Sequence, residues 1–444
     1  MKYYLAIDIG ASSGRHIIGY LDNNQMVYKE IYRFKNEVKL VNNHLIWDID
    51  ELVKQVKLGI QESLKLYPNI ESLSIDTWGV DYALLNGNET IYPVYAYRDT
   101  RTEKAINEVH KIIPFERLYE ITGSQFQVFN SIYQLYKDKM DGRLDKATDF
   151  LMIPEYIIYK LTNKKVKEFT NGATTGLYDC KTLKISDEII NKLGFPDFVK
   201  HETYKPGHVV GDLSCDVQKE VNGNIKVVLC ATHDTASAVE GIEMESNAPY
   251  ISSGTWSLLG IKNDVSINTL EAMQANYSNE FGKNYIRVQK NIMGLWIIQC
   301  LAKQTNLDFA MMVELAKTSN YKSIYDVNDK RFLSSLDMKT TIVDYFKEKN
   351  QDYPKTDADL INSTYHSLAY SYKVALEELE RITNKKYQQL YIVGGGAKNN
   401  YLNELTKKYT NKEIIALPIE ATSVGNIKMQ MEADNEKTNN WTIQ

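Results

Sequence analysis

Residues 8–15, Asp8-Ile9-Gly10-Ala11-Ser12-Ser13-Gly14-Arg15, form a short stretch of small residues that separates two apolar runs near the N-terminus. The run before it, Tyr3 to Ile7, and the run after it, His16 to Tyr20, are rich in the β-branched and aromatic residues that favour strands. We therefore predict two antiparallel neighbouring strands joined by a turn of Gly and Ser residues.

The composition of this turn is typical of a phosphate-binding loop. Gly10 and Gly14 allow backbone N–H groups to approach an anion, and Ser12 and Ser13 add hydroxyl donors. Asp8, at the end of the first strand, is a candidate to organise a Mg²⁺ ion, which prefers hard oxygen ligands and keeps several of its waters. An ordinary hairpin turn can have the same composition, so a partner elsewhere in the chain must decide between the two interpretations.

The segments after this hairpin favour an α/β fold. A third strand is expected from Met26 to Phe34, a helix from Asp48 to Leu66 and a buried strand from Ile70 to Ile75. No Walker motif of the form G-x-x-x-x-G-K-[ST] occurs in the sequence, which favours phosphate binding by hairpins. The expected helix carries apolar residues at the spacing of one buried face, at Leu52, Val53, Val56, Ile60 and Leu64.

The second half of the chain loosely repeats this pattern. Tyr250 to Ile261 is again an apolar run, a Ser/Gly/Thr turn and an apolar run, as expected of duplicated domains. A chain of 444 residues exceeds the size at which single cores stop growing, so two domains are expected. We place them at residues 1–243, with the first hairpin, and at residues 244–444, with the second.

The remaining segments add a helix-rich middle region and a glycine-rich loop. The helix-rich region is expected from Arg98 to Leu161, and a strand from Lys226 to Leu229. Toward the C-terminus, a helix from Tyr365 to Arg381 is followed by a strand, Leu390 to Val393, and by Gly394-Gly395-Gly396. A triple glycine alone is most often a tight turn, but its position after a buried strand favours close approach of the backbone to a ligand.

The composition limits the classes of partner. The formal net charge is -5 and no long Lys/Arg block occurs, which disfavours nucleic acid and anionic membranes. Asp8 interrupts the first apolar run, so no signal peptide is expected, and no apolar stretch reaches the roughly 18 residues that a membrane span needs. We therefore expect a cytoplasmic protein with small diffusible partners, whose oligomeric state the sequence leaves open. The widely spaced cysteines are expected to be reduced thiols in the core: Cys180, Cys215, Cys230 and Cys300.

ATP would account for the two hairpins and the glycine loop together. One hairpin from each half would hold the β and γ phosphates, while the glycine loop would lie against adenosine. Phosphoryl transfer needs mostly positioning, charge stabilisation and a residue that accepts the proton of the attacking hydroxyl. Asp234 suits that role because an aspartate is ionised at neutral pH. The alternative is that Asp234 only caps a helix that begins there.

Several longer segments resemble the FGGY family of sugar kinases. Residues 8–15 resemble the family's N-terminal ATP loop. Ile75-Asp76-Thr77-Trp78-Gly79-Val80-Asp81 and Ala96-Tyr97-Arg98-Asp99-Thr100-Arg101 resemble a sugar-site signature that differs among kinases for other sugars. The resemblance runs from Ile7 to about Gln430 and includes Gly123 to Phe126, Phe129 to Leu135 and Lys290 to Trp296.

The resemblance implies a fold and a set of site residues. The expected fold is α/β, with two ribonuclease-H-like domains of the actin and hexokinase type and the active site in a central cleft. By this resemblance Asp234 would accept the proton, while Asp8 remains, from its own chemistry, the candidate to hold Mg²⁺ through water. The residues that would contact the sugar are Gly79, His233, Asp234, Thr235 and Asn291. Those that would hold ATP are Ala11, Ser12, Ser13, Gly14, Arg15, Thr255, Gln299 and Gly395.

The activity that the resemblance implies is ATP-dependent phosphorylation of L-rhamnulose at its 1-hydroxyl. A kinase for another ketose, such as L-fuculose or xylulose, is the first alternative, and residues 76–81 would distinguish the two. A catalytically silent sugar or nucleotide sensor on the same fold is the second, although Asp8, Asp234 and Thr255 are all retained. The family normally continues with further helix after a segment like residues 419–427. Here residues 434–440 are polar, so the second domain is expected to be shortened at its C-terminus.

Overall fold

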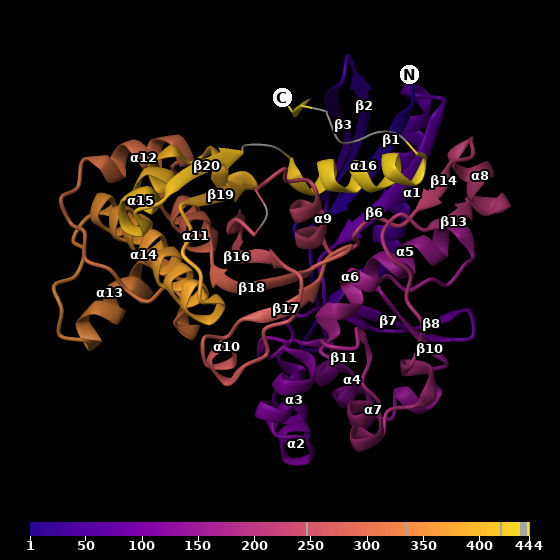
Figure 1. Cartoon of the computed structure of the whole chain (residues 1–444), viewed down its shortest axis with the longest axis horizontal. Coiled ribbons are helices and arrows are strands. Elements are labelled where there is room, and N and C mark those ends of the chain that lie inside the picture. The colour runs from indigo at the N-terminus through magenta and orange to yellow at the C-terminus, as the bar shows by residue number, and fades with distance from the viewer. Residues whose placement is uncertain (246, 334, 418–419, 436–441, 444) are drawn as a thin grey trace. The chain divides into compact units, whose positions relative to one another are not determined.

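The computed structural model describes residues 1–245, 247–333, 335–417, 420–435 and 442–443 (Figure 1). The chain forms two compact units. Unit 1 consists of Met1–Glu243, Asn263–Arg287 and Ile419–Gln444, and unit 2 consists of Met244–Lys262 and Val288–Pro418. These units are defined by packing, and two later segments of the chain belong to unit 1. The division into sequence domains 1–243 and 244–444 remains a prediction.

Unit 1 is built on a seven-stranded sheet in the order β13-β14-β6-β1-β2-β3-β21. β1 (Tyr3–Ile9) pairs antiparallel with β2 (Ser13–Asp22), which pairs antiparallel with β3 (Gln25–Lys35). β1 also pairs parallel with β6 (Ile70–Thr77). The hairpin predicted around residues 8–15 is therefore confirmed, together with the third strand. The remaining strands of this sheet are β13 (Val209–Asp212), β14 (Lys226–Val228) and β21 (Thr442–Ile443).

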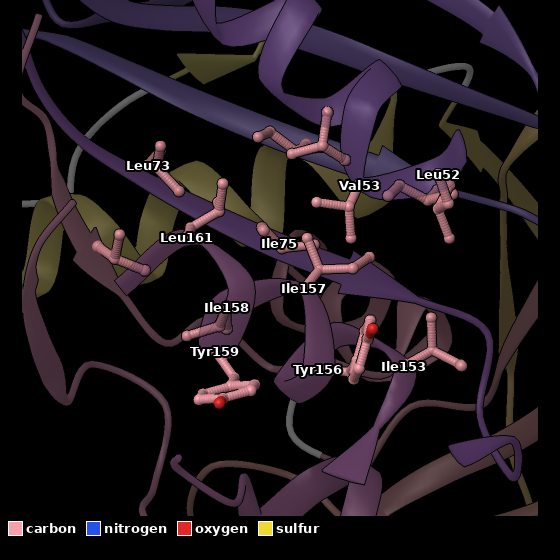
Figure 2. Close-up of a cluster of buried hydrophobic side chains, with 14 of the residues drawn as sticks. Leu52, Val53, Leu73, Ile75, Ile153, Tyr156, Ile157, Ile158, Tyr159 and Leu161 are labelled. Atoms are coloured by element: carbon pink, nitrogen blue, oxygen red, sulfur yellow. The ribbon is translucent and has the colours of Figure 1, made fainter. Parts of the chain in front are cut away.

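A large apolar core holds β6 against two helices. α1 (Ile49–Leu66) begins after Asp48, whose side chain accepts a hydrogen bond from the first turn, and its five predicted core residues are all buried. Figure 2 shows side chains of α1, β6 and α5 (Ile153–Thr162) gathered in one buried cluster, among them Val53 and Ile75. Burial of each such side chain contributes about 1.5–3 kcal/mol. This core therefore fixes the strand that ends next to the candidate site.

The middle of unit 1 is rich in helix, as predicted for residues 98–161. α2 (Glu103–Ile112), α3 (Phe115–Thr122) and α4 (Ser131–Met140) lead to β10 (Asp149–Met152) and α5. Smaller sheets have the orders β10-β7-β8, β4-β5-β9 and β11-β12. Their other strands are β4 (Lys39–Val41), β5 (His44–Trp47), β7 (Tyr82–Asn86), β8 (Glu89–Ile91), β9 (Val94–Tyr95), β11 (Tyr178–Asp179) and β12 (Lys184–Ile185). Further elements are α6 (Phe169–Gly172), α7 (Asp187–Leu193), α8 (Cys215–Val221), α9 (Asp234–Glu240), α10 (Leu270–Gln274), β17 (Ser278–Phe281) and α16 (Ala421–Ala433).

α16 is attached to the sheet of unit 1 through buried polar side chains. The Asn426 amide donates to the carboxylate of Asp76 at 2.6 Å. The Gln430 side chain donates to the Leu5 carbonyl at 3.1 Å and accepts from the Ser72 hydroxyl at 2.7 Å. Because these partners lie on β1 and β6, the bonds fix α16 on two neighbouring parallel strands.

Unit 2 repeats the strand pattern of unit 1. β15 (Tyr250–Ser253) pairs antiparallel with β16 (Trp256–Asn263) and parallel with β19 (Gln389–Val393), which pairs parallel with β20 (Glu413–Leu417). With β18 (Ile286–Met293), the order β18-β16-β15-β19-β20 matches the order β3-β2-β1-β6-β14 of unit 1. The second hairpin is therefore confirmed, and the two sheets share one topology, as expected of duplicated domains.

The longest helix of unit 2, α14 (Asp357–Thr383), begins earlier than the helix predicted from residue 365. Thr356 accepts a hydrogen bond from the Asp359 N–H at 3.1 Å, and Asp359 accepts one from the Thr356 N–H at 3.2 Å. This reciprocal capping box stabilises the first turn, a signal that apolar periodicity does not contain. Further helices of unit 2 are α11 (Trp296–Thr305), α12 (Phe309–Lys317), α13 (Met338–Glu348) and α15 (Asn400–Thr410).

The prediction that all four cysteines lie in the core is wrong. Cys180 and Cys230 are buried, but Cys215 is exposed and Cys300 is only partly buried. Cys215 is the first residue of α8, and wide spacing along a sequence does not by itself indicate burial. All four thiols are free, as predicted.

The polar tail predicted for residues 434–440 lies mostly outside the described residues, because 436–440 are not described. α16 ends just before it, at Ala433. Within the described ranges, no helix has both the length and the apolar character that a membrane span needs.

Candidate active site

The turn between β1 and β2 is held by hydrogen bonds to its backbone. The Gly10 N–H donates to the Ser13 carbonyl at 2.9 Å. Asn36, which follows β3, donates its backbone N–H to the Ser12 carbonyl at 3.0 Å and its side-chain amide to the Gly10 carbonyl at 2.9 Å. Ser12 is exposed and Ala11 is half-buried. The turn therefore presents a hydroxyl to solvent on a braced backbone.

Gly14 has a packing role in this hairpin. A Cβ atom at this position would overlap the ring of Phe34, the residue that pairs with Gly14 on β3. At Gly10, a Cβ atom would lie 3.6 Å from the Ser13 carbonyl oxygen, which is an ordinary contact. The close packing of Phe34 against β2 is therefore enough to explain why position 14 is a glycine. The sequence analysis had explained this glycine by the approach of backbone N–H groups to an anion.

Arg15 joins the hairpin to the segment before α16. Its guanidinium donates to the Asp8 carboxylate at 2.5 Å and to the Glu420 carboxylate at 2.6 Å. Burial by itself would lower the pKa of Arg15, but these two carboxylates raise it above its usual range. Arg15 is therefore a fixed positive charge beside the buried Asp8.

Asp8 and Asp76 are paired residues at the carboxyl ends of the parallel strands β1 and β6. Asp76 is fully buried, and within the described chain its Oδ1 atom has no hydrogen-bond partner. Burial raises the pKa of Asp76 well above its usual range, and the charges of Asp8 and Asp234 raise it further. These adjacent carboxylates fit the preference of Mg²⁺ for hard oxygen ligands. The described residues hold no group of three or more metal-binding side chains, so a Mg²⁺ ion here would need water or substrate oxygens as further ligands.

Asp234 is the first residue of α9, next to the end of β6. The Thr77 N–H donates to the Thr232 carbonyl at 2.9 Å, which fixes the start of this segment. The N-cap residue is His233, whose side chain makes no capping bond. The Asp234 carboxylate accepts from the Thr235 N–H at 2.6 Å and is 33% exposed. Burial raises the pKa of Asp234, the nearby His233 lowers it, and Asp8 raises it.

His233 connects Asp234 to a buried ion pair. Its Nε2 atom lies 3.5 Å from the Asp234 carboxylate, and its Nδ1 atom lies 3.3 Å from the Glu280 carboxylate. Arg287, which is fully buried, contacts Glu280 at 3.1 Å and the His233 Nδ1 atom at 3.4 Å. The sequence analysis missed Glu280 and Arg287, because they lie in no local motif and reach His233 only through the fold.

α9 is held in position by the close approach of α16. A Cβ atom on Gly425 of α16 would overlap the Ser237 carbonyl of α9, and one on Gly241 would overlap the Ala421 carbonyl. The Ser237 hydroxyl also donates to the Thr422 carbonyl at 2.9 Å. The two backbones are therefore in direct contact, which sets the position of the helix that begins with Asp234.

The remaining residues predicted to contact sugar are divided between the units. Gly79 is buried just after β6, where a Cβ atom would lie 3.0 Å from the Thr174 side chain. Thr235 is buried in the first turn of α9. Asn291 is half-buried on β18 and belongs to unit 2, whereas Gly79 and Thr235 belong to unit 1.

In unit 2, the fold brings together Thr255 and Gln299, which were both predicted to hold ATP. Thr255 lies in the turn between β15 and β16, and its carbonyl accepts from the Trp296 N–H at the start of α11 at 3.2 Å. The Gln299 side-chain amide, one turn along α11, donates to the Thr255 hydroxyl at 3.4 Å. The second hairpin therefore rests on the N-terminal turn of a helix.

The glycine loop lies against the same hairpin. Gly394 has a φ of 81°, and a Cβ atom there would lie 2.8 Å from the Ser253 carbonyl oxygen. A Cβ atom on Gly396 would overlap the Ser253 side chain, whereas one on Gly395 would meet no atom within 4 Å. Two of the glycines are therefore required by packing, and Gly395 faces open space.

The sequence profile of one enzyme family matches both halves of the chain. Residues 3–241 match the N-terminal domain of the FGGY family of carbohydrate kinases, and residues 249–433 match its C-terminal domain.

Individual relatives match over nearly the whole chain. A rhamnulokinase from Oceanobacillus iheyensis is 42% identical over 435 residues, which cover 97% of this chain and 93% of the relative. A rhamnulokinase from Bacillus subtilis is 40% identical over 441 residues, which cover 98% and 90%.

Solved structures of sugar and polyol kinases share the fold. A xylulose kinase from Lactobacillus acidophilus matches with a TM-score of 0.81 at 16% identity, covering 98% of this chain and 90% of that chain. The glycerol kinase from Plasmodium falciparum with ADP matches with a TM-score of 0.77 at 15% identity, with coverage of 98% and 90%. Such low identities support the fold and not the substrate. The predicted two-domain α/β kinase fold is confirmed.

The contrast between two adjacent glycines gives a test of unit 2. We expect Gly396→Ala to lower the thermal unfolding midpoint, because the added methyl group would overlap Ser253 and such overpacking costs about 1–3 kcal/mol. Gly395→Ala is the matched control and should unfold like the wild type. Differential scanning calorimetry of the purified full chain measures both, and equal midpoints for the two variants would contradict this packing.

Proposed function

The chain belongs to the FGGY family of carbohydrate kinases, and we propose that it uses ATP to phosphorylate L-rhamnulose at the 1-hydroxyl, giving L-rhamnulose 1-phosphate. The observation that carries the proposal is the 42% identity to a rhamnulokinase over 97% of this chain. We assign the reaction to the cytoplasm, as the sequence predicts.

The two alternatives have less support. Xylulose kinases share the fold at 16% identity or less, far below the identity of the rhamnulokinases, so a kinase for another ketose is not favoured. A silent sensor would not need a proton acceptor. Asp234 with its partner His233 is the arrangement expected of an enzyme.

Asp234 is the proposed proton acceptor. Its carboxylate takes the proton of the 1-hydroxyl as that oxygen forms a bond to the γ-phosphorus, while the bond from this phosphorus to the bridging oxygen breaks and ADP leaves. A loose transition state of this kind does not need a strong base. Two observations support the role: the carboxylate is 33% exposed, and the His233 Nε2 atom lies 3.5 Å from it.

The proposed ATP contacts come from the two hairpins and the glycine loop. Ala11 to Arg15 would surround a phosphate with backbone N–H groups, the Ser12 hydroxyl and the Arg15 charge. Thr255 and Gln299, whose side chains share a hydrogen bond, would contact the nucleotide from unit 2. Gly395 is suited to close approach of a ligand because a Cβ atom there would meet nothing within 4 Å.

Mg²⁺ is the metal expected with ATP, and the carboxylates present suit it. Asp8 would hold the ion through water, beside Asp76. The ion would neutralise phosphate charge during transfer. The other proposed sugar contacts are Gly79, Thr235 and Asn291, which would orient the ketose.

A substrate panel tests the proposal. The purified full chain is assayed with ATP and either L-rhamnulose, L-fuculose or xylulose, with ADP release coupled to NADH oxidation. We expect kcat/KM for L-rhamnulose to exceed that for the other ketoses by at least about tenfold. A preference for another ketose would replace the substrate, and the absence of turnover with every sugar would overturn the proposed activity.

Replacement of the proposed base gives a second test. We expect Asp234→Asn to lower kcat by about 10²-fold to 10⁴-fold, the range for loss of a general base, with sugar binding largely retained. Steady-state kinetics and calorimetric titration with L-rhamnulose measure the two effects. Asp216→Asn is the matched control, because the Asp216 side chain is 88% exposed and should leave kcat unchanged. Near-normal turnover of Asp234→Asn would rule out this role.

The pH dependence of turnover tests the electrostatics of the same residue. We expect kcat to fall as the pH decreases through the pKa of Asp234, because only its ionised form accepts a proton. His233 lowers this pKa, so His233→Gln should raise it and move the acidic limb of the kcat profile to higher pH. His208→Gln, outside the site, should leave the limb in place. A limb that stays fixed or moves to lower pH in His233→Gln would contradict the assignment.

A further inference from the structure

The turn at Gly79, Val80 and Asp81 has an unusual backbone. The Asp81 N–H donates to the Gly79 carbonyl at 2.9 Å, which closes a three-residue turn, and Val80 at its centre has a φ of 66°. Apart from Leu183, the other non-glycine residues with positive φ in the described chain are asparagines. A β-branched residue in this region is strained, and such strain persists only where the surroundings enforce it.

Three neighbouring side chains hold the strained peptide. The Val80 N–H donates to the Thr174 hydroxyl at 3.1 Å. The Val80 carbonyl accepts from the Ser131 hydroxyl at 2.6 Å and from the Gln134 amide at 3.3 Å. Ser131 and Gln134 lie in the first turn of α4, so this helix fixes one side of the turn.

The Asp81 carboxylate fixes the other side. It is fully buried, and its Oδ2 atom accepts from the indole of Trp47 at 2.7 Å, the indole of Trp78 at 2.9 Å and the Tyr97 N–H at 3.0 Å. Its Oδ1 atom accepts from the Gln134 amide at 3.0 Å. A carboxylate has about four acceptor sites, and four protein donors approach this buried one, three at Oδ2 and one at Oδ1. Asp81 is therefore not placed to bind a ligand itself.

Three of these four donors reach Asp81 from distant parts of the sequence, and Trp78 is three residues away from it. Trp47 ends β5, Trp78 follows β6, Tyr97 follows β9 and Gln134 lies in α4. The rings of Trp47 and Trp78 are 4.2 Å apart between centroids. One buried charge thus joins two indoles, a loop and a helix around the turn that contains Gly79.

We propose that Asp81 is a positioning residue for sugar recognition, which fixes the Gly79–Val80 turn and the Trp47–Trp78 pair in the geometry that accepts the ketose. This inference rests on the proposed function, in which Gly79 contacts the sugar. It goes beyond that function by assigning specificity to a residue that does not touch the substrate.

The chemistry of the carboxylate explains why an amide cannot replace it. In Asp81→Asn, one acceptor oxygen becomes an NH₂ group that faces protein donors. At least one buried indole or amide donor then loses its partner, and the turn must shift to relieve the conflict. A shift of about 1 Å in a contact with substrate can change kinetics by up to about 10²-fold.

The first experiment compares Asp81→Asn with Glu155→Gln. Glu155 is also a buried carboxylate of unit 1 and accepts from the Met152 and Glu168 N–H groups, outside the turn. We expect Asp81→Asn to raise KM for L-rhamnulose at least about tenfold, with KM for ATP within about twofold of the wild type. Glu155→Gln should leave both KM values unchanged. A purely structural role for Asp81 would reduce the amount of active enzyme and leave both KM values unchanged.

A second variant keeps the inference testable if Asp81→Asn does not fold. Val80→Gly should fold, because glycine adopts a φ of 66° without strain. Glycine also allows the backbone many other conformations, so the turn is less well fixed, and KM for L-rhamnulose should again rise while KM for ATP stays constant. If the wild type is active and every variant that folds keeps the wild-type KM for L-rhamnulose, the inference is overturned and the proposed function stands. Wild type that phosphorylates no sugar would overturn the proposed function, and with it the premise of the inference.

Discussion

The close contact between α9 and α16 fixes the part of unit 1 that carries the proposed base. The two backbones approach so closely that a side chain on Gly241 or Gly425 would overlap a carbonyl of the other helix. α9 begins with Asp234, and α16 comes from the far end of the chain. Asn426 of α16 also donates to Asp76 at the end of β6. The position of the proposed base is therefore set by the last helix described, through glycine contacts that allow little adjustment.

The buried carboxylates of unit 1 are stabilised in different ways, and the differences follow their proposed roles. Arg15 neutralises Asp8. Four donors satisfy Asp81, which makes it a rigid support. Asp76 keeps one oxygen without a partner in the described chain, and Asp234 stays partly exposed. Burying charge is costly unless it is paired. The incompletely paired carboxylates are thus those nearest the proposed chemistry, where strain and unpaired groups are most often tolerated.

The two sheets share one strand order, yet their hairpins carry different chemistry. The first hairpin combines an exposed Ser12 with the charged pair of Arg15 and Asp8. The second has no such ion pair in the described residues and instead joins Thr255 to Gln299 on a helix. A duplicated framework therefore supplies two similar turns, and the side chains around each turn decide what it can bind.

Features that depend on near neighbours could be predicted from the sequence. Apolar periodicity predicted α1, and runs of strand-forming residues around small residues predicted both hairpins, because a strand or a helix face is a property of adjacent positions. The family resemblance supplied Asp234, but not its surroundings. The fold alone brought Glu280 and Arg287 to His233, and Trp47, Tyr97 and Gln134 to Asp81, because these contacts join residues 16 or more positions apart. Burial likewise had to be seen in the fold, as the exposed Cys215 shows. A local sequence pattern predicts helices, strands and turns. The packing of the chain decides which side chains are in contact and how far each charge is buried or paired.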